Sequence, residues 1–382
     1  MSSKFLFLLF SFLSYTMLAQ TLAEGDKAFE EKNFSVAKTI YLTHLKKISP
    51  AQRAKLGFCF YLEENHEEAA TYFEKAAKEN DLLGNRFMAY FYENGIGGYE
   101  QDIEQSIEYY SRAAKRKDII SLSRLGYIYS NGKGVEVNPK KAFDYYTKAA
   151  KLGGGTAINN LGYMYENGNF VEKDLKKAFG LYTKSAEMMD VYGLSSLARL
   201  YETGIYVSKD LAKAIELYEE AAFQNHAPAQ VSLGNFYLEG RGVPQDYKKA
   251  YAWFDKAATQ LEPTAMVNIG RMYREGLGVE KDYKKALKIF LFAAKSNNKF
   301  AYYELGNFYY NGAGVPKDLK KALTYYELAG ERGFAEAQSV VGYMYEHGEG
   351  TAVNTIKALE WYQKAAAQNH SYSLKKVAAL KK

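Results

Sequence analysis

The chain has little cysteine and little proline, and its charges nearly balance. Cys59 is its single cysteine, so neither an intramolecular disulfide nor a multi-thiolate zinc site can form. The 50 Lys and Arg against 44 Asp and Glu give a net charge of +6, which is too small for a dedicated nucleic-acid binder of 382 residues. With 25% charged and 47% hydrophobic residues, the composition also excludes a mainly disordered protein.

Long hydrophobic runs are equally scarce, and the one present lies at the N-terminus. Lys4 is followed by an apolar stretch, FLFLLFSFLSYTMLA, that is too short for a comfortable membrane span. We interpret residues 1–19 as a signal peptide, cleaved after Ala19 or, by the small-residue rule, after Ala23. An uncleaved anchor is the alternative. We therefore expect an exported protein without a membrane span, located in the bacterial periplasm or outside the cell, or in a eukaryotic secretory lumen.

What the chain has in excess is tyrosine (35) and glycine (31), and both recur with a fixed period. The dipeptide Leu125-Gly126 reappears every 36 residues as Leu161-Gly162, Leu197-Ala198, Leu233-Gly234, Ile269-Gly270, Leu305-Gly306 and Val341-Gly342. An earlier unit at Met88-Ala89 lies 37 residues before Gly126, and two shorter units precede it. A tyrosine stands three residues after each of these Gly positions, and a second Gly stands six residues after it, as in Gly126, Tyr129 and Gly132. This spacing predicts a helix, helix A, that ends at the second Gly.

A second helix, helix B, is predicted after a short loop. The loop ends in Asp or Asn, as in GRGVPQD at 240–246, and such residues cap helix N-termini. Helix B ends near Gly or Asn in most units, but Lys117, Met189 and Leu261 stand there in three, so we expect those turns to differ. A helix pair of this size buries its apolar faces only by stacking on neighbours. We expect most tyrosines to be structural, with rings that bury area in this stack and hydroxyls that can reach loop carbonyls of the next unit.

The pattern LGxxYxxGxGVxxDxxKAxxWYxKAA resembles the Sel-1-like repeat family, a relative of tetratricopeptide repeats, and residues 233–258 match it almost throughout. The resemblance implies an all-α fold, an α/α solenoid in which stacked helix pairs form a right-handed superhelix. It divides the chain into two tetratricopeptide-like repeats (22–81), eight Sel-1-like repeats (82–370) and a C-terminal capping helix (371–382). Members of the family serve as adaptors and scaffolds, which implies a protein or peptide partner. A few cysteine-rich members have been proposed to act on β-lactams.

The sequence contains no assembled catalytic or metal site, so we expect neither enzymatic activity nor a cofactor. Ser35 to Lys38 and Ser373 to Lys376 match the S-x-x-K pattern of serine acyl enzymes, but each lies outside the context that this motif requires. Phosphate-loop and dinucleotide motifs are absent. Lysine pairs such as Lys248-Lys249 occupy one position in five units and would align as a ribbon able to attract an anionic polymer.

The resemblance places helix A on the inner, concave side of the solenoid. The positions after the Gly, four further along and three before it are therefore candidate partner-binding sites. They hold Tyr127, Asn159, Tyr163, Arg199, Asn235, Arg271, Tyr303, Asn307, Tyr310 and Tyr343. Phe170 and Tyr206 replace the second loop Gly in neighbouring units, and we hypothesise a secondary contact patch there.

The favoured function is therefore an exported, non-enzymatic scaffold that binds a protein or peptide on its concave face. Two alternatives remain open at this point. One is an exported hydrolase of the proposed β-lactamase type, and the other is a binder of an anionic envelope polymer along the lysine ribbon.

Overall fold

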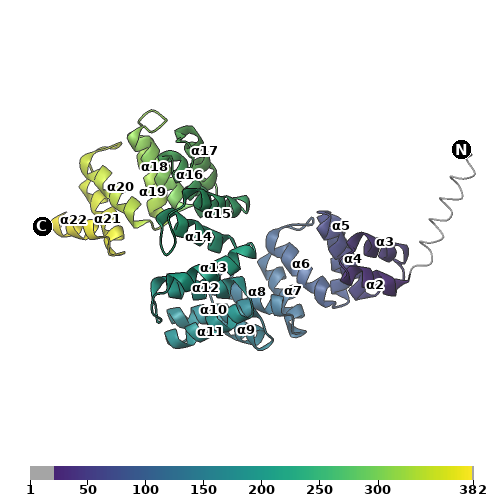
Figure 1. Cartoon of the computed structure of the whole chain (residues 1–382). Helices are drawn as coiled ribbons and strands as arrows, with labels where there is room; N and C mark the ends of the chain where they lie inside the picture. Colours follow the sequence, from purple (N-terminus) through teal and green to yellow (C-terminus); the bar gives the residue numbers. More distant parts are fainter. Residues whose placement is uncertain (1–20, 381–382) are drawn as a thin grey trace, which may run out of the picture. The chain divides into compact units, whose positions relative to one another are not determined.

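The computed structural model describes residues 21–380, which form 21 α-helices and no β-strand (Figure 1). The predicted signal peptide, 1–19, lies outside the described residues, as do residues 381–382 at the end of the predicted cap. Each repeat supplies an even-numbered A helix and an odd-numbered B helix, and consecutive helices pack against each other from α2 to α11 and from α13 to α22. The predicted all-α architecture of stacked helix pairs is confirmed.

The chain divides into two compact units, Met1–Gly193 and Leu194–Lys382, which are described separately as unit 1 and unit 2. The A helices of unit 1 are α2 (Leu22–Glu30), α4 (Pro50–Leu62), α6 (Leu82–Asn94), α8 (Ile119–Asn131) and α10 (Gly155–Asn167). Its B helices are α3 (Phe34–Thr43), α5 (His66–Lys78), α7 (Ile103–Lys115), α9 (Pro139–Lys151) and α11 (Leu175–Glu187).

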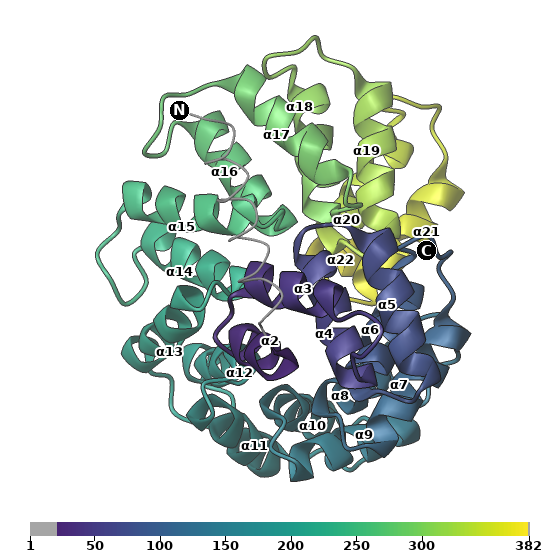
Figure 2. The ribbon, with the colours of Figure 1, turned by 90° about the vertical axis from the view of Figure 1, so that its right-hand side faces the viewer.

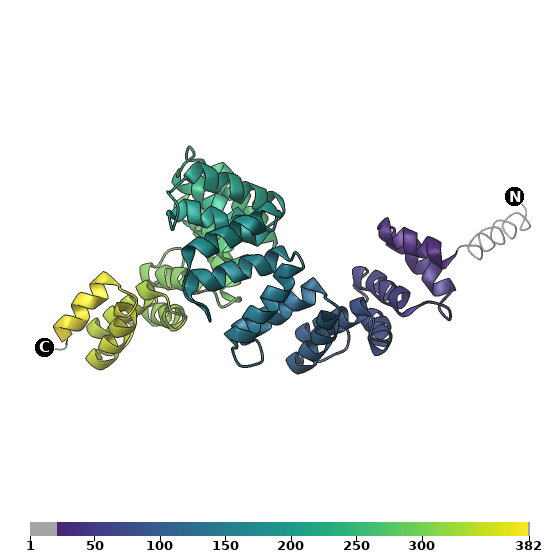
Figure 3. The same cartoon turned by 90° about the horizontal axis from the view of Figure 1, so that it is seen from below.

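Unit 2 repeats the same arrangement, and α12 (Val191–Thr203) begins just before its boundary. Its further A helices are α14 (Ala227–Glu239), α16 (Pro263–Glu275), α18 (Lys299–Asn311), α20 (Ala335–His347) and α22 (Ser371–Leu380). Its B helices are α13 (Leu211–Phe223), α15 (Tyr247–Thr259), α17 (Tyr283–Ala294), α19 (Leu319–Glu331) and α21 (Thr355–Ala366). Figures 2 and 3 show the helix pairs lying side by side within each unit.

The predicted helix ends are confirmed by their hydrogen bonds. The A helices α6, α8, α10, α14, α16, α18 and α20 end at a Gly with φ between 65° and 75°, the left-handed conformation that stops a helix. Asp246 accepts a bond from the backbone N–H of Lys249 (3.0 Å) and donates its own N–H to the carbonyl of Tyr237 (2.9 Å). The same two hydrogen bonds form at the Asp or Asn that ends each of the other loops between helix A and helix B from α8 to α21. These bonds within the loop fix the angle between the two helices.

The expectation that three inter-repeat turns differ is wrong. Lys117, Met189 and Leu261 have φ of 66°, 60° and 61°, the conformation that Asn225 and Gly333 adopt at the same position. In each case two backbone N–H groups close the turn, as when Lys117 donates to Ala114 (2.9 Å). Packing of the next A helix therefore imposes the left-handed residue even where its side chain disfavours it.

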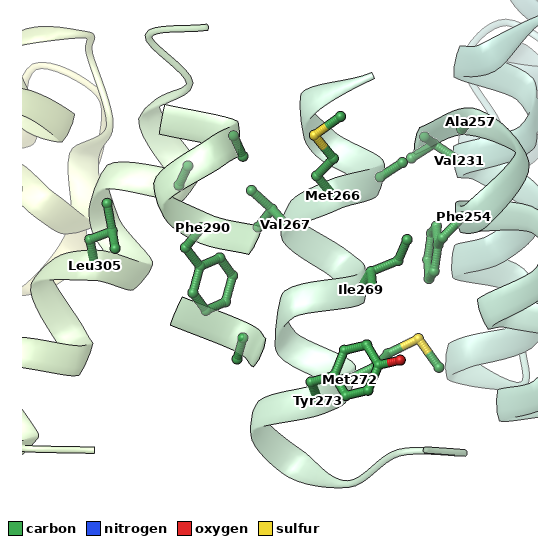
Figure 4. Close-up of a cluster of buried hydrophobic side chains, with 14 of the residues drawn as sticks. Val231, Phe254, Ala257, Met266, Val267, Ile269, Met272, Tyr273, Phe290 and Leu305 are labelled. Atoms are coloured by element: carbon green, nitrogen blue, oxygen red, sulfur yellow. The ribbon is translucent and has the colours of Figure 1, made fainter. Parts of the chain in front are cut away.

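The Gly that gave the period is where helix B crosses helix A. A Cβ added at Gly270 would stand 2.5 Å from the ring of Phe290, and one at Gly234 would stand 2.4 Å from Phe254. Figure 4 shows α16 in the centre of this packing, with Ile269 beside Phe254 and Val267 beside Phe290. Absence of a side chain at the Gly thus lets an aromatic ring lie on the helix backbone.

The prediction for the tyrosine hydroxyls needs correction. In four B helices the buried hydroxyl bonds to a glutamate of the A helix in its own repeat, not to a loop carbonyl of the next. Tyr110 donates to Glu93 (3.0 Å), and the pairs Tyr182–Glu166, Tyr218–Glu202 and Tyr362–Glu346 repeat this bond at 2.6, 2.9 and 2.8 Å. Where Phe254 and Phe290 replace the tyrosine, Leu238 and Arg274 replace the glutamate.

Candidate interaction surface on the A helices

In unit 1 the residue after the packing Gly, or after Ala89 in α6, is an exposed tyrosine on three consecutive A helices. Tyr90 on α6, Tyr127 on α8 and Tyr163 on α10 are 37%, 41% and 54% exposed. We call these three residues the aromatic row. Large rings exposed in register are the side chains that protein interfaces use as anchors.

An asparagine at the end of each of these helices supports the aromatic row. Asn94, Asn131 and Asn167 donate a side-chain N–H to the carbonyl of the row tyrosine four residues earlier, at 2.7, 2.9 and 2.9 Å. This bond orients each amide, so its oxygen is held in place as an acceptor near the ring. The row therefore combines flat apolar surface with fixed polar groups.

A buried carboxylate joins two helices of the row. Glu93 on α6 is fully buried, and Arg124 on α8 bonds to both of its oxygens, with Nε at 2.9 and 2.8 Å. Lys133 also bonds to it (2.8 Å). Burial acts to raise the pKa of Glu93, but the hydrogen bonds from Arg124 and Lys133 outweigh burial and lower it. The guanidinium of Arg124 then lies 4.6 Å from the centre of the Tyr127 ring, as a cation–π pair.

In unit 2 the same position carries polar side chains instead. It holds Arg199 on α12, Asn235 on α14, Arg271 on α16, Asn307 on α18 and Tyr343 on α20, all half-buried. Bonds between neighbouring A helices link part of this set: Asn268 on α16 donates to Asn235 (3.1 Å). We call these five residues the polar row.

The strongest contact of the polar row is a second buried carboxylate. Glu304 on α18 is 2% exposed and accepts from Nε of Arg271 at 2.5 Å. Its other oxygen accepts from Arg274 and, at 3.4 Å, from Asn307. Asn307 in turn accepts from the Tyr326 hydroxyl (2.8 Å). The structure thus brings Arg271 and Asn307 together through a residue that the sequence analysis did not select.

The remaining predicted residues differ in their exposure. Tyr303 packs edge-on against Phe334 with ring centroids 5.0 Å apart, and Tyr343 stacks on His347 at 4.1 Å. Both stay half-exposed, as does Tyr310, whose pKa is raised to about 12 by its hydrogen bond to Glu349. Asn159 is buried and offers little surface to a partner.

Phe170 and Tyr206 are both exposed, with φ of 68° and 71°. They keep the left-handed conformation of the glycines they replace, which is an outlier for an aromatic residue. Phe170 lies in unit 1 against Phe143, with ring centroids 5.6 Å apart, whereas Tyr206 belongs to unit 2. The secondary patch therefore remains a hypothesis, with Phe170 as its member in unit 1.

In the predicted lysine ribbon, the second lysine of each pair packs on a tyrosine ring. The second lysine of each pair lies over the tyrosine three residues after the Gly of its own repeat: Lys177 is 4.0 Å from the centre of the Tyr165 ring, and Lys285 is 4.1 Å from that of Tyr273. The first lysines, such as Lys248 and Lys320, are exposed. Near them an open hollow of about 600 Å³ is lined by Tyr309, Pro316, Lys317, Asp318, Leu319 and Lys321.

The remaining reactive side chains are the possible metal ligands, Cys59 and the lysines of the two S-x-x-K segments. Among residues 21–380, no group of three or more His, Cys, Asp or Glu side chains could hold a metal ion, and no helix is long and apolar enough to cross a membrane. Cys59 is buried, which raises its pKa to about 11. In both S-x-x-K segments the lysine is paired with a glutamate, Lys38 with Glu63 at 2.6 Å and Lys376 with Glu346 at 2.8 Å.

Sequence reasoning missed Tyr90, Glu93 and Glu304. Tyr90 follows Ala89 in the unit that is offset by one residue, so aligning that unit with the others would have selected it. The two glutamates carried no sequence signal as site residues, because a buried carboxylate on an A helix is recognised only through its cationic partners.

Comparison with known proteins agrees with this geometry. The model of the family described as "Sel1 repeat" matches nine segments: 55–81, 83–118, 119–154, 155–188, 191–226, 227–260, 263–298, 299–334 and 335–370. The chain belongs to the Sel1 repeat family. The first match falls inside the segment, 22–81, that the sequence analysis assigned to tetratricopeptide-like repeats.

Two solved Sel1 repeat structures resemble most of the chain. One is a protective antigen of uropathogenic Escherichia coli strains displaying an SLR fold, with 29% identity, a TM-score of 0.57, and coverage of 94% of this chain and 79% of that one. The other is a Sel1 repeat protein from Oxalobacter formigenes, with 28% identity, a TM-score of 0.53, and coverage of 87% and 94%. No curated protein sequence matches the chain.

Proposed function

We propose that this Sel1 repeat protein is an exported, non-enzymatic scaffold that binds a protein or peptide segment along its A helices. The observation that carries the proposal is the aromatic row, in which Tyr90, Tyr127 and Tyr163 hold exposed rings in register on consecutive helices. Sel1 repeats commonly mediate protein interactions. Rigid helices that present oriented aromatic and amide groups bind a partner with little loss of their own freedom.

A peptide selection tests this proposal. A library of random peptides is selected against the immobilised full chain and against the variant with Tyr127→Ser and Tyr163→Ser. We expect a related set of peptides to be enriched by the wild type and to be lost with the double variant. The control is Phe223→Ser, which removes a 74% exposed ring from a B helix and should leave the enriched set unchanged. Equal enrichment by all three proteins would contradict the proposal.

The hydrolase alternative meets a physical obstacle at the second S-x-x-K segment, Ser373 to Lys376. A lysine acts as a general base only when its amine is neutral, and the hydrogen bond from Lys376 to Glu346 raises the pKa of Lys376. Ser373 is itself buried. A nitrocefin assay on the purified protein measures this alternative directly, and we expect no turnover above background.

The polymer alternative is favoured by one observation, the exposed first lysines Lys248, Lys284 and Lys320 of unit 2. It predicts binding to an anionic polymer that weakens steeply with salt and survives loss of the aromatic row. Substituting all three lysines by Gln separates it from peptide binding, which should not change.

Export is proposed with cleavage after Ala19. In the structure the side chain of Thr21 accepts from the backbone N–H of Glu24 (3.3 Å), and Glu24 bonds back to the N–H of Thr21 (2.5 Å). This capping box begins α2 and would be lost if cleavage followed Ala23. Mass spectrometry of the protein recovered from the exported fraction should give Gln20 as the first residue. An intact N-terminus, or a chain that starts at Glu24, would contradict this site.

A further inference from the structure

One arginine of the polar row keeps most of its hydrogen-bonding capacity unused. Arg271 donates Nε to the buried Glu304, and its side chain is 39% exposed. The other N–H groups of its guanidinium have no partner among residues 21–380. Glu304 is buried and fully engaged by Arg271, Arg274 and Asn307, so it acts as a fixed support that holds the arginine at the surface.

Further unused donors lie on the two neighbouring A helices. Asn235 on α14 accepts from Asn268, and its own amide N–H groups find no acceptor in the described part of the chain. The hydroxyl of Tyr303 on α18 likewise has no partner within residues 21–380. Burial, followed by the charges of Glu304 and Glu336, raises the pKa of Tyr303, so its hydroxyl remains a donor at neutral pH.

Hydrogen bonds connect the three neighbouring A helices that carry these groups. Asn235 is tied to α16 through Asn268, and Arg271 is tied to α18 through Glu304, the residue next to Tyr303. Within this cluster Glu304 pairs with Arg271, and Glu275 pairs with Arg274, with Nε to Oε1 at 2.6 Å.

We propose that Arg271, with Asn235 and Tyr303 beside it, binds the carboxylate of an Asp or Glu side chain in the polypeptide held by the A helices of unit 2. A guanidinium edge matches a carboxylate in a bidentate manner, and such charge-assisted bonds are short and strong. The inference rests on the proposed function. It adds that the partner segment must present an acidic residue to unit 2.

The test uses the full chain and random peptides that are joined to their carrier through the C-terminus, so that side chains supply the only peptide carboxylates. Wild type is compared with Arg271→Gln, whose amide can still donate to Glu304. The matched control is Arg241→Gln in the same unit. Arg241 is similarly exposed, but its Nη1 donates to Glu202 (2.8 Å) and its guanidinium lies 4.5 Å from the centre of the Phe236 ring. Circular dichroism and thermal unfolding verify that each variant is folded. If Arg271→Gln does not fold, Arg271→Lys, which keeps the charge but loses the bidentate guanidinium, takes its place in the comparison.

Peptides enriched by the wild type and by Arg241→Gln should share an Asp or Glu at one position, and peptides enriched by Arg271→Gln should lack it. For one enriched peptide, changing that acid to its amide should weaken binding to the wild type about tenfold. The same change should have little effect on binding to Arg271→Gln, because the two substitutions remove one interaction.

The experiment distinguishes failure of the carboxylate site from failure of the proposed function. An acidic preference that survives Arg271→Gln, or enriched peptides without an acidic position, would overturn the carboxylate site and leave peptide binding intact. If dependence on Arg271 appeared only in a second library joined through the N-terminus, whose peptides have free C-termini, the cluster would bind a chain terminus and the side-chain proposal would be overturned. If the wild type enriches no peptide, the proposed function itself fails.

Discussion

At the scale of single residues, the packing Gly of each A helix decides how closely helix B can approach. Ala is normally the better helix former, by about 1 kcal/mol. At Gly306 an added Cβ would stand 2.5 Å from the ring of Tyr326, whereas at Gly180, in the B helix α11, it would meet nothing within 4 Å. The same substitution should therefore have opposite effects at these two positions.

We expect Gly306→Ala to destabilise the protein by about 1–2 kcal/mol, because overpacking outweighs the gain in helix propensity. Two repeats accommodate Ala at this position, Ala89 and Ala198, so the cost should be moderate. Gly180→Ala should stabilise by about 0.5–1 kcal/mol. Thermal unfolding of the two variants measures both signs, and a shift in the same direction for both would contradict this account of the Gly.

Glu93 should make the stability of unit 1 depend on acid pH. Its pKa is lowered in the folded chain, so the unfolded chain takes up a proton first as the pH falls. The stabilisation is complete above the ordinary Glu pKa of about 4.3 and is lost as the pH falls through the lowered folded value. Hydrogen exchange of peptides from α6 and α8 between pH 6 and pH 3 measures this loss.

Substituting Glu93→Gln should lower stability at pH 7 by about 2 kcal/mol, because Arg124 and Lys133 lose their buried partner. It should also flatten the acid dependence of exchange in α6 and α8. The control, Glu187→Gln, changes an exposed glutamate at the end of α11 and should leave the pH profile unaltered. An acid dependence that is the same with and without Glu93 would exclude it as the source.

At the scale of elements, the sequence predicted helices and their ends well because caps and C-terminal glycines are local signals. The residues adjacent in sequence were enough to predict that Gly240 ends α14 and that Asp246 caps the start of α15. The turn at Lys117 was predicted wrongly because its left-handed conformation is imposed by packing of the next helix, which no single residue reveals. The glutamate partners of the helix-B tyrosines were missed for the same reason.

The last helix, α22, has no helix after it in the described residues and depends on its contact with the preceding repeat. Lys376 pairs with Glu346 (2.8 Å), Tyr372 packs against Tyr362, and Val377 covers the last core cluster. Deleting residues 371–382 should expose this cluster and raise hydrogen exchange in α20 and α21. Exchange in α6 to α10 should stay unchanged, because repeats couple mainly to their neighbours. A uniform rise along the chain would indicate long-range coupling instead.

At the scale of the whole molecule, the chain is a series of similar helix pairs. Periodicity predicted stacked helix pairs, because each pair must bury its apolar faces against its neighbours. The resemblance to Sel-1-like repeats implied the concave side of helix A and so selected Tyr127, Tyr163 and Arg271. Which of the selected residues are exposed, as Tyr163 is and Asn159 is not, depends on how adjacent helices pack, and only the coordinates supply that.

The central claim is that the A helices, and not the B helices or loops, receive the partner. Photo-cross-linking measures this directly: a peptide enriched by the wild-type chain carries a photoreactive side chain, and mass spectrometry maps the residues that it joins. The account predicts adducts on α6, α8 and α10 around the aromatic row, or on α14, α16 and α18 around Arg271. Adducts confined to the B helices or to the loops that precede them would contradict it.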